Sequence, residues 1–353
     1  MRAIVGNVIP RHFLKQLALL LWVPLSPAMA ADLIIYTWDD YITESLVSQF
    51  EQQTGHTLKF KYFQSDLERD TNISDAAVEF DIAITDAYTL QGFENSGFFG
   101  DIDKGLYTNH KHLASRWRDT CGPQGVPFFW GGVGIAYRAS QIIVPVDSWG
   151  QLLVPEPALR GRITMLYDTF DLLLPPLKML GYSGNTVEAD ELKQAYNLLQ
   201  KQQDYVADYT SSYGAVVSLP QGNELAMVQA HSGDQLILAD LTGHEDWKFV
   251  YPKEGTSIWM DCISISASIR SLSAAYELVE FLLDPAVAAQ LAEEIDIASP
   301  NESALALVGP QYLNDTSIFI PEAVLELTEE QRDRSIDIQA IRNKVLLSLK
   351  NKK

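Results

Sequence analysis

The sequence predicts an α/β protein built from two lobes. Strand-like and helix-like segments alternate along the chain, a pattern typical of largely parallel sheets flanked by helices. Even without its first 30 residues, the chain of 353 exceeds the ~250–300 residues at which a single core usually divides. No repeat, low-complexity tract or long Gly/Ser linker marks a boundary. We therefore expect short segments of the chain to cross between the lobes more than once.

Residues 1–30 have the composition of a cleaved secretory signal peptide. The basic residues Arg2, Arg11 and Lys15 precede the apolar stretch Leu17–Leu25, and Ala28–Ala30 supplies a small-x-small cleavage site. The apolar stretch is shorter than the ~20 residues that span a bilayer. No cysteine follows the expected cut, which disfavours a lipid anchor. We therefore expect an exported, soluble protein.

The first strand and helix follow this segment. Leu33–Thr37 is an apolar run of strand length, Thr43 is placed to cap a helix, and Gly55 is placed to end it. In Leu58–Tyr62, apolar residues alternate with lysines, as in a half-buried strand. The pattern predicts a strand–helix–strand unit.

Later segments repeat this alternation. Strand-like runs lie at Asp81–Thr85, Ile163–Tyr167, Leu225–Val228, Phe249–Tyr251 and Cys262–Ile265, and helical spacing occurs at Leu192–Leu199 and Ala275–Leu282. Two segments are candidates for crossings between the lobes, Gly131–Tyr137 and Ser257–Ile265. The glycines of the first would serve either as a hinge or as a tight bulge in a strand.

Trp38, Asp39, Asp40 and Tyr41 occupy the turn between the first strand and the first helix. Ligands of open α/β sheets bind just beyond the carboxyl ends of the strands. Two rings and two carboxylates at such a place suit a ligand with an apolar body and positive charge.

Charge and cysteine content narrow the class of partner. The formal net charge of −20 argues against nucleic acid and anionic membranes and favours cationic partners, although it also serves solubility. Cys121 lies in a turn-rich segment and Cys262 in an apolar strand, so we expect two separate thiols. The six scattered histidines show no zinc-type spacing, and we expect neither a metal nor another cofactor.

Several acids outside helical faces follow apolar runs and neighbour aromatic residues. The acids are Asp39, Asp40, Asp86, Asp168, Asp171, Asp234 and Asp261, and the rings are Trp38, Tyr41, Tyr88, Tyr167, Phe170 and Trp259. Any one acid could be a helix cap or turn residue, but Asp261 leads into a strand. A polyamine would explain the set, because its ammonium groups need carboxylates and its methylenes need ring faces.

An enzymatic interpretation has less support. Asp168 and Asp171 could act as acid and base on a glycoside, with His231 as a general base. The acids are spread over five segments, however, and no Ser-His, Cys-His or phosphate-cradling motif is present. The spacing of Asp168 and Asp171 also suits a helix start, and a lone histidine after a strand is more often structural. We expect binding rather than catalysis.

Short motifs in a characteristic order resemble one known family. They are Ile35–Tyr41, Phe50–Gly55, Phe80–Ile84, Val126–Gly131, Val146–Trp149, Leu180–Thr186, Tyr251–Gly255, Trp259–Asp261 and Phe281–Pro285. From about Leu33 onward the chain is similar to the periplasmic spermidine/putrescine-binding proteins of bacterial polyamine ABC transporters. The resemblance implies a type II-like periplasmic binding protein fold, whose two lobes are joined by crossover strands and close on the ligand. Residues 31–137 and 260–305 would form lobe 1, and residues 138–259 and 306–353 lobe 2.

The resemblance also implies roles for single positions. Trp38, Tyr41, Tyr88 and Trp259 match aromatic walls, and Asp40, Asp168, Asp171, Asp234 and Asp261 match amine-binding acids. Asp39 is either a further ligand contact or a helix cap. Asp86 stands where a serine is usual, His231 where a tryptophan is expected, and Ile297 where a tyrosine is expected. Gln331 lies near a C-terminal polar ligand residue.

These departures argue against a standard uptake protein. A subgroup of the family resembles the binding proteins in fold but serves signalling: its members are periplasmic polyamine sensors of the norspermidine-sensing type, which dock on a transmembrane receptor. We expect a monomeric periplasmic polyamine-binding protein whose partner is such a receptor or, alternatively, an ABC permease, with a slight preference for the sensor. We expect no nucleic-acid partner. The charged run Asp66–Asp70 is interpreted as a solvated surface.

Overall fold

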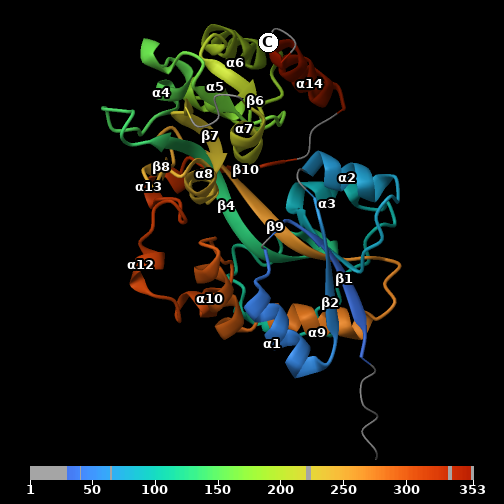
Figure 1. The fold of residues 1–353 in the computed structure, drawn as a ribbon. Helices are drawn as coiled ribbons and strands as arrows, with labels where there is room; N and C mark the ends of the chain where they lie inside the picture. Colours follow the sequence, from blue (N-terminus) through green and yellow to red (C-terminus); the bar gives the residue numbers. More distant parts are fainter. Residues whose placement is uncertain (1–29, 40, 64–65, 220–223, 333–335, 351–353) are drawn as a thin grey trace, which may run out of the picture.

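The computed structural model describes residues 30–39, 41–63, 66–219, 224–332 and 336–350 (Figure 1). Its strands are β1 Asp32–Thr37, β2 Thr57–Tyr62, β3 Ile82–Asp86, β4 Gly125–Arg138, β5 Ile163–Met165, β6 Val206–Tyr209, β7 Met227–His231, β8 Trp247–Val250, β9 Ser257–Ile265 and β10 Glu329–Glu330. Its α-helices are α1 Glu44–Thr54, α2 Asp66–Ser74, α3 Ala87–Phe93, α4 Trp149–Leu153, α5 Leu174–Met179, α6 Ala189–Gln202, α7 Ser212–Ser218, α8 Asp234–Thr242, α9 Leu272–Leu282, α10 Pro285–Glu294, α11 Glu302–Leu305, α12 Pro310–Leu313, α13 Glu322–Leu325 and α14 Ile336–Lys350.

One path of paired strands runs through the molecule in the order β2-β1-β3-β9-β4-β7-β5-β6, with β10 beside β9 and β8 beside β4. At one end β1 is parallel to β2 and β3, and at the other β5 is parallel to β6 and β7. Between them, β9 and β4 are antiparallel to each other and to their outer neighbours β3 and β7. Two parallel units joined by antiparallel strands confirm the predicted fold class.

The first strand–helix–strand unit forms where its periodicity predicts. Helix α1 follows Thr43 and buries Leu46 and Phe50. Gly55 ends the helix in the left-handed region at φ 76° and donates its N–H to a carbonyl of the last turn, as C-terminal glycines commonly do. Thr43 makes no side-chain capping bond, because its hydroxyl donates instead to Glu294 of α10 at 2.6 Å.

Strands β4 and β9 lie side by side between the two groups of elements in Figure 1. Strand β4 pairs with β9 as far as Gly132 and with β7 beyond it. The irregularity in this ladder lies at Pro127–Phe129 rather than in the glycine-rich part. At Gly131 a β-carbon would overlap Ser232 and the ring of Trp259. This glycine therefore allows the crossing strands to approach each other closely.

Cys121 and Cys262 form a disulfide, so the expectation of two separate thiols is wrong. Their Cα atoms are 5.9 Å apart, within the range of protein disulfides. Cys121 precedes β4, and the antiparallel pairing of Pro127 with Cys262 places the start of β4 beside the middle of β9. Strand pairing, which the spacing of the two cysteines does not reveal, brings them together.

The C-terminal helix α14 packs beside α6 (Figure 1). Its residues Val345, Leu346 and Leu349 share a core with Leu192 of α6. Arg342 is fully buried and donates to two backbone carbonyls just before α6. Within the described ranges, none of the helices has the length and apolar character required to span a membrane.

Reduction of the Cys121–Cys262 bridge is expected to lower the Tm. The bridge joins residues 141 positions apart, and in the chain-entropy model such a loop closure stabilises a fold by about 4–5 kcal/mol. Thermal unfolding with and without dithiothreitol measures the effect. The Cys121→Ser/Cys262→Ser variant serves as control, because its Tm should not respond to reductant. An unchanged Tm of the fully reduced natural chain would contradict this expectation.

Candidate functional site

The candidate site is a cleft between two groups of side chains. The α2–β9 wall consists of Tyr41, Asp66, Arg69, Asp86, Trp259 and Asp261. The β5–β7 wall consists of Asp168, Asp171, His231 and Asp234. Charge interactions cross between the walls, since Asp66 interacts with His231 and Asp168. Tyr41 likewise interacts with Asp234. Carboxyl groups from α2, from the loop after β5 and from the start of α8 therefore lie around one shared space, which we call the cleft.

Asp261 is the most deeply buried acid of the α2–β9 wall. It lies on β9 with 6% of its surface exposed, and Tyr41 Oη donates to its Oδ2 at 2.6 Å. Burial raises the pKa of Asp261 to about 7, against the lowering effect of the Tyr41 hydrogen bond, and the charges of Asp66 and Asp86 also raise it. A bound cation would relieve both the burial penalty and the repulsion.

Asp86 is the neighbour of Asp261 across the strands. The two residues are paired in the antiparallel ladder of β3 and β9, so their side chains lie on the same face. Asp86 is also the N-cap of α3, where its Oδ1 accepts the N–H of Thr89 at 2.6 Å. Burial alone would raise the pKa of Asp86, but Arg69 and the hydrogen bonds from Thr89 lower it below its usual value.

Arg69 shows that the charged run Asp66–Asp70 is not simply a solvated surface, and that interpretation is wrong for Arg69 itself. The Arg69 side chain is 0% exposed. Its guanidinium lies 2.8 Å from Asp66 and from Asp70 and 2.6 Å from Asp86. Helix α2 directs the Arg69 side chain inward. The three carboxylates around the guanidinium compensate for the water that this buried cation loses.

Asp168 opens the β5–β7 wall. Its Oδ1 accepts the N–H groups of Phe170 at 2.6 Å and Asp171 at 2.9 Å, so the alternative interpretation as a turn-forming residue is correct for that oxygen. Solvent reaches Asp168. Nevertheless, the protein on both sides of the cleft raises its pKa by desolvation, and the charge of Asp171 raises it further. Asp168 therefore stabilises a turn and also adds a carboxyl group to this wall of the cleft.

Asp171, His231 and Asp234 form the rest of this wall. His231 Nε2 lies 3.1 Å from Asp171 Oδ2. Asp234 Oδ2 accepts the backbone N–H of His231 at 2.9 Å and the hydroxyl of Ser212 at 2.7 Å. Burial lowers the pKa of His231, but the hydrogen bond and charge of Asp171, followed by Asp234 and Asp66, raise it to about 9. A histidine that is protonated at neutral pH is unsuited to act as a general base.

Aromatic rings border the α2–β9 wall. A cavity of about 60 Å³ is lined by Asp86, Ala87, Tyr88, Gln91, Thr120, Ile258, Trp259, Met260, Glu330 and Gln331. Trp259 is partly exposed, and its Nε1 is buried without a hydrogen-bond partner among the described residues. Tyr88 Oη accepts a bond of 3.5 Å from Gln339 of α14. Trp38 packs edge-on against Phe63, with 4.5 Å between ring centroids.

In the first turn, Tyr41 reaches the wall through its bond to Asp261. Asp39 is exposed in the turn. Asp40 lies outside the described residues, so its role stays a prediction. Sequence reasoning missed Asp66 and Arg69 as parts of the site. Their spacing of three in a helix, which places them on one face, was the available signal.

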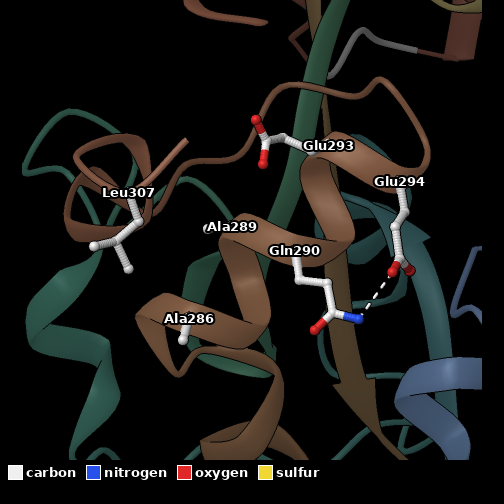
Figure 2. A pocket seen from close by; sticks show the side chains of 6 residues that line it. All are labelled: Ala286, Ala289, Gln290, Glu293, Glu294 and Leu307. Carbon is white, nitrogen blue, oxygen red and sulfur yellow. Dashed lines mark hydrogen bonds between the residues drawn. The ribbon is translucent and has the colours of Figure 1, made fainter. Parts of the chain in front are cut away.

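A larger hollow of about 420 Å³ lies on helix α10 (Figure 2). It is lined by Ala286, Ala289, Gln290, Glu293, Glu294 and Leu307. Glu294 already accepts hydrogen bonds from Gln290 at 2.8 Å and Thr43 at 2.6 Å, and Glu293 accepts one from a backbone N–H. No aromatic ring is among the lining residues. The cleft is therefore the candidate site because acids and aromatic rings lie together there, although the hollow on α10 has the larger volume.

The model of the family described as bacterial extracellular solute-binding protein matches residues 45–319. The chain belongs to this family. A norspermidine sensor from Vibrio cholerae is 33% identical over 323 residues, which cover 91% of this chain and 89% of the relative. A spermidine/putrescine-binding periplasmic protein from Escherichia coli is 29% identical over 334 residues, which cover 92% of this chain and 93% of the relative.

A solved structure described as a putative spermidine/putrescine ABC transporter from Listeria monocytogenes agrees with these matches. It has a TM-score of 0.78 and 25% identity, and the alignment covers 91% of this chain and 99% of that one. The resemblance drawn from the sequence motifs is thereby confirmed. These relatives are solute-binding proteins rather than enzymes, and so is this chain.

Arg69→Met is expected to lower the free energy of unfolding by about 3–5 kcal/mol, because it removes a fully buried cation and leaves three closely spaced carboxylates without it. Urea unfolding at neutral pH measures the loss. Arg160→Met is the matched control, since the Arg160 side chain is 60% exposed and pairs with the equally exposed Asp204, so a much smaller loss is expected. Equal losses in the two variants would show that the Arg69 cluster does not stabilise the fold.

Proposed function

We propose that this protein binds polyamines in the periplasm. The observation that carries the proposal is the excess of acid in the cleft. Its two walls hold the carboxyl groups of Asp66, Asp86, Asp168, Asp171, Asp234 and Asp261, whereas the cationic side chains of these walls are Arg69 and His231. A ligand with several positive charges would balance this excess.

The rings support an elongated ligand rather than a metal ion. Tyr41, Trp259 and, beside them, Tyr88 offer faces to methylene groups, at about 0.8 kcal/mol for each buried CH₂. Each ammonium–carboxylate hydrogen bond is worth roughly 1.5–3 kcal/mol. A few of each exceed the entropy lost on immobilising a flexible chain and reach about −8 kcal/mol, which is micromolar affinity. Among the described residues, no group of three or more His, Cys, Asp or Glu side chains is arranged for a metal.

The relatives support the same ligand class and location. They are named for norspermidine, spermidine and putrescine, and the Escherichia coli relative is named as periplasmic. The signal-peptide-like composition of residues 1–30 is consistent with export. We propose a monomer that has no cofactor and does not bind nucleic acid.

Closure of the lobes is the proposed response to ligand. The lobes would consist of residues 31–137 with 260–305 and of residues 138–259 with 306–353. A cation bound between the two walls reduces the repulsion between their acids. Binding would thus favour the closed arrangement and present a new surface to a partner at the inner membrane.

We propose that the protein is a sensor that acts through a transmembrane receptor, in preference to a subunit that delivers its ligand to an ABC permease. Identity is somewhat higher with the norspermidine sensor, at 33%, than with the spermidine/putrescine-binding protein, at 29%. The charge of the cleft also includes Asp86, where the transporter proteins typically have serine. Neighbouring genes separate the two cases: one receptor gene with a periplasmic domain supports sensing, whereas permease and ATPase genes support transport.

The ligand class is tested by thermal shift and calorimetry on the purified mature chain. Diamines and triamines are expected to raise the Tm, and neutral sugars are not. Asp261→Asn should weaken polyamine binding at least tenfold, because it removes one charged contact worth ~1.4 kcal/mol or more. Its amide oxygen can still accept the Tyr41 hydrogen bond. Asp101→Asn, at an exposed position, is the control for charge alone. A response to sugars but not to amines would overturn the proposal.

Polyamine binding is expected to release protons below neutral pH. Asp261, with its pKa raised to about 7, is largely protonated at pH 6, and an adjacent ammonium group lowers that pKa. Calorimetry in buffers of different ionisation enthalpy should show a contribution from Asp261 that approaches about one proton per ligand at pH 6 and is small at pH 8.5. Asp261→Asn should abolish the difference. Equal proton release by the natural chain and the variant would exclude Asp261 from the binding reaction.

A further inference from the structure

The His231 side chain pairs with an acid of the cleft, Asp171. Its imidazole Nε2 is 3.1 Å from Asp171 Oδ2, and its Nδ1 is 4.0 Å from Asp234 Oδ2. The side chain keeps 38% of its surface exposed. The imidazole is thus neither a core residue nor a free surface group. It lies at the boundary between the wall and the space of the cleft.

The groups around His231 hold it in the protonated state. Asp171 from the loop after β5, Asp234 at the start of α8 and Asp66 from α2 across the cleft all raise its pKa, to about 9 despite the opposing effect of burial. Asp168 also senses its charge. At neutral pH this wall therefore holds three carboxyl groups and one cation of its own.

An imidazolium ion on a carboxylate resembles a primary ammonium group on the same carboxylate. Both carry one positive charge and donate an N–H bond of about 2.7–2.9 Å when fully formed. An incoming ammonium group would have to share Asp171 with His231 or displace it. Repulsion between two neighbouring cations makes either arrangement less favourable than binding to an unoccupied acid.

We propose that His231 is a specificity-determining residue, a built-in cation that occupies Asp171 and thereby reduces by one the number of ligand ammonium groups held at the β5–β7 wall. This inference rests on the proposed polyamine-binding function. In this role, His231 selects ligands by their number of positive charges and not by contact with an aromatic wall. The cleft would thereby favour ligands with fewer charges than its acids alone suggest.

Substitution of His231 can remove the imidazolium charge and still leave the backbone contacts of this wall in place. The backbone N–H of His231, not its side chain, holds Asp234 at 2.9 Å, so this bond persists in any variant. His231→Gln retains a donor that can reach Asp171 but removes the charge. His231→Lys retains a positive charge. His244→Gln makes the same change in the turn before β8, outside the two walls.

The test compares the Kd values of spermidine, a triamine, and putrescine, a diamine, by calorimetry at pH 7 on the full mature chain. His231→Gln should shift the affinity ratio toward spermidine at least fivefold, whereas His231→Lys and His244→Gln should leave it within twofold of the natural chain. If His231→Gln does not fold, His231→Asn replaces it with the same expectation. A ratio unchanged by removal of the charge, or equally shifted by lysine, would overturn this inference alone. Absence of binding of both amines to the natural chain would instead overturn the proposed function.

Discussion

The antiparallel pairing of β9 with β3 and β4 is the constraint on which the rest of the structure depends. Asp261 stands opposite Asp86 of β3, and the next residue, Cys262, is bonded to Cys121 ahead of β4. Because successive side chains of a strand point to opposite faces, a slip of one residue would remove Asp261 from the cleft. The disulfide on one face therefore helps to hold the carboxyl group on the other. Trp259, on the same face as Asp261, is positioned by the same register.

Two acids placed side by side on one sheet reduce the stability of the fold, and the two are compensated differently. The pKa of Asp261 is raised from 3.8 to about 7, so the stability associated with this group is complete below its unfolded pKa and is lost as the pH rises through 7. The pKa of Asp86 is lowered by Arg69. Its contribution is therefore present above the unfolded pKa and is lost on acidification. Arg69 stabilises the ionised form of Asp86, whereas the ionised form of Asp261 would be stabilised by the cation of a ligand.

Local sequence patterns predicted the secondary structure and the candidate acids that depend on neighbouring residues. The alternation of Leu58–Tyr62 and the position of Gly55 were sufficient for the first strand–helix–strand unit. Asp168, Asp171, Asp234 and Asp261 could be selected because they neighbour apolar, strand-like runs. Pairings between distant segments could not be predicted this way. The Cys121–Cys262 bridge spans 141 positions and follows from strand register. The burial of Arg69 depends on Asp86, 17 positions away. Without that contact, the charged run Asp66–Asp70 is typical of a solvated surface.

The two resident cations of the cleft differ in what they can do. Arg69 is 0% exposed and ion-paired with three carboxylates, so it acts as part of the scaffold, and its removal would leave three neighbouring acids without their cation. His231 is 38% exposed and hydrogen-bonded to one carboxylate, so it can yield that partner at lower cost. Arg69 thus partners acids of the α2–β9 wall permanently, while His231 partners an acid of the β5–β7 wall for which a ligand can compete. An acid-rich cleft built in this way gains from each ammonium group that it binds, because acids without a permanent partner lie on both walls.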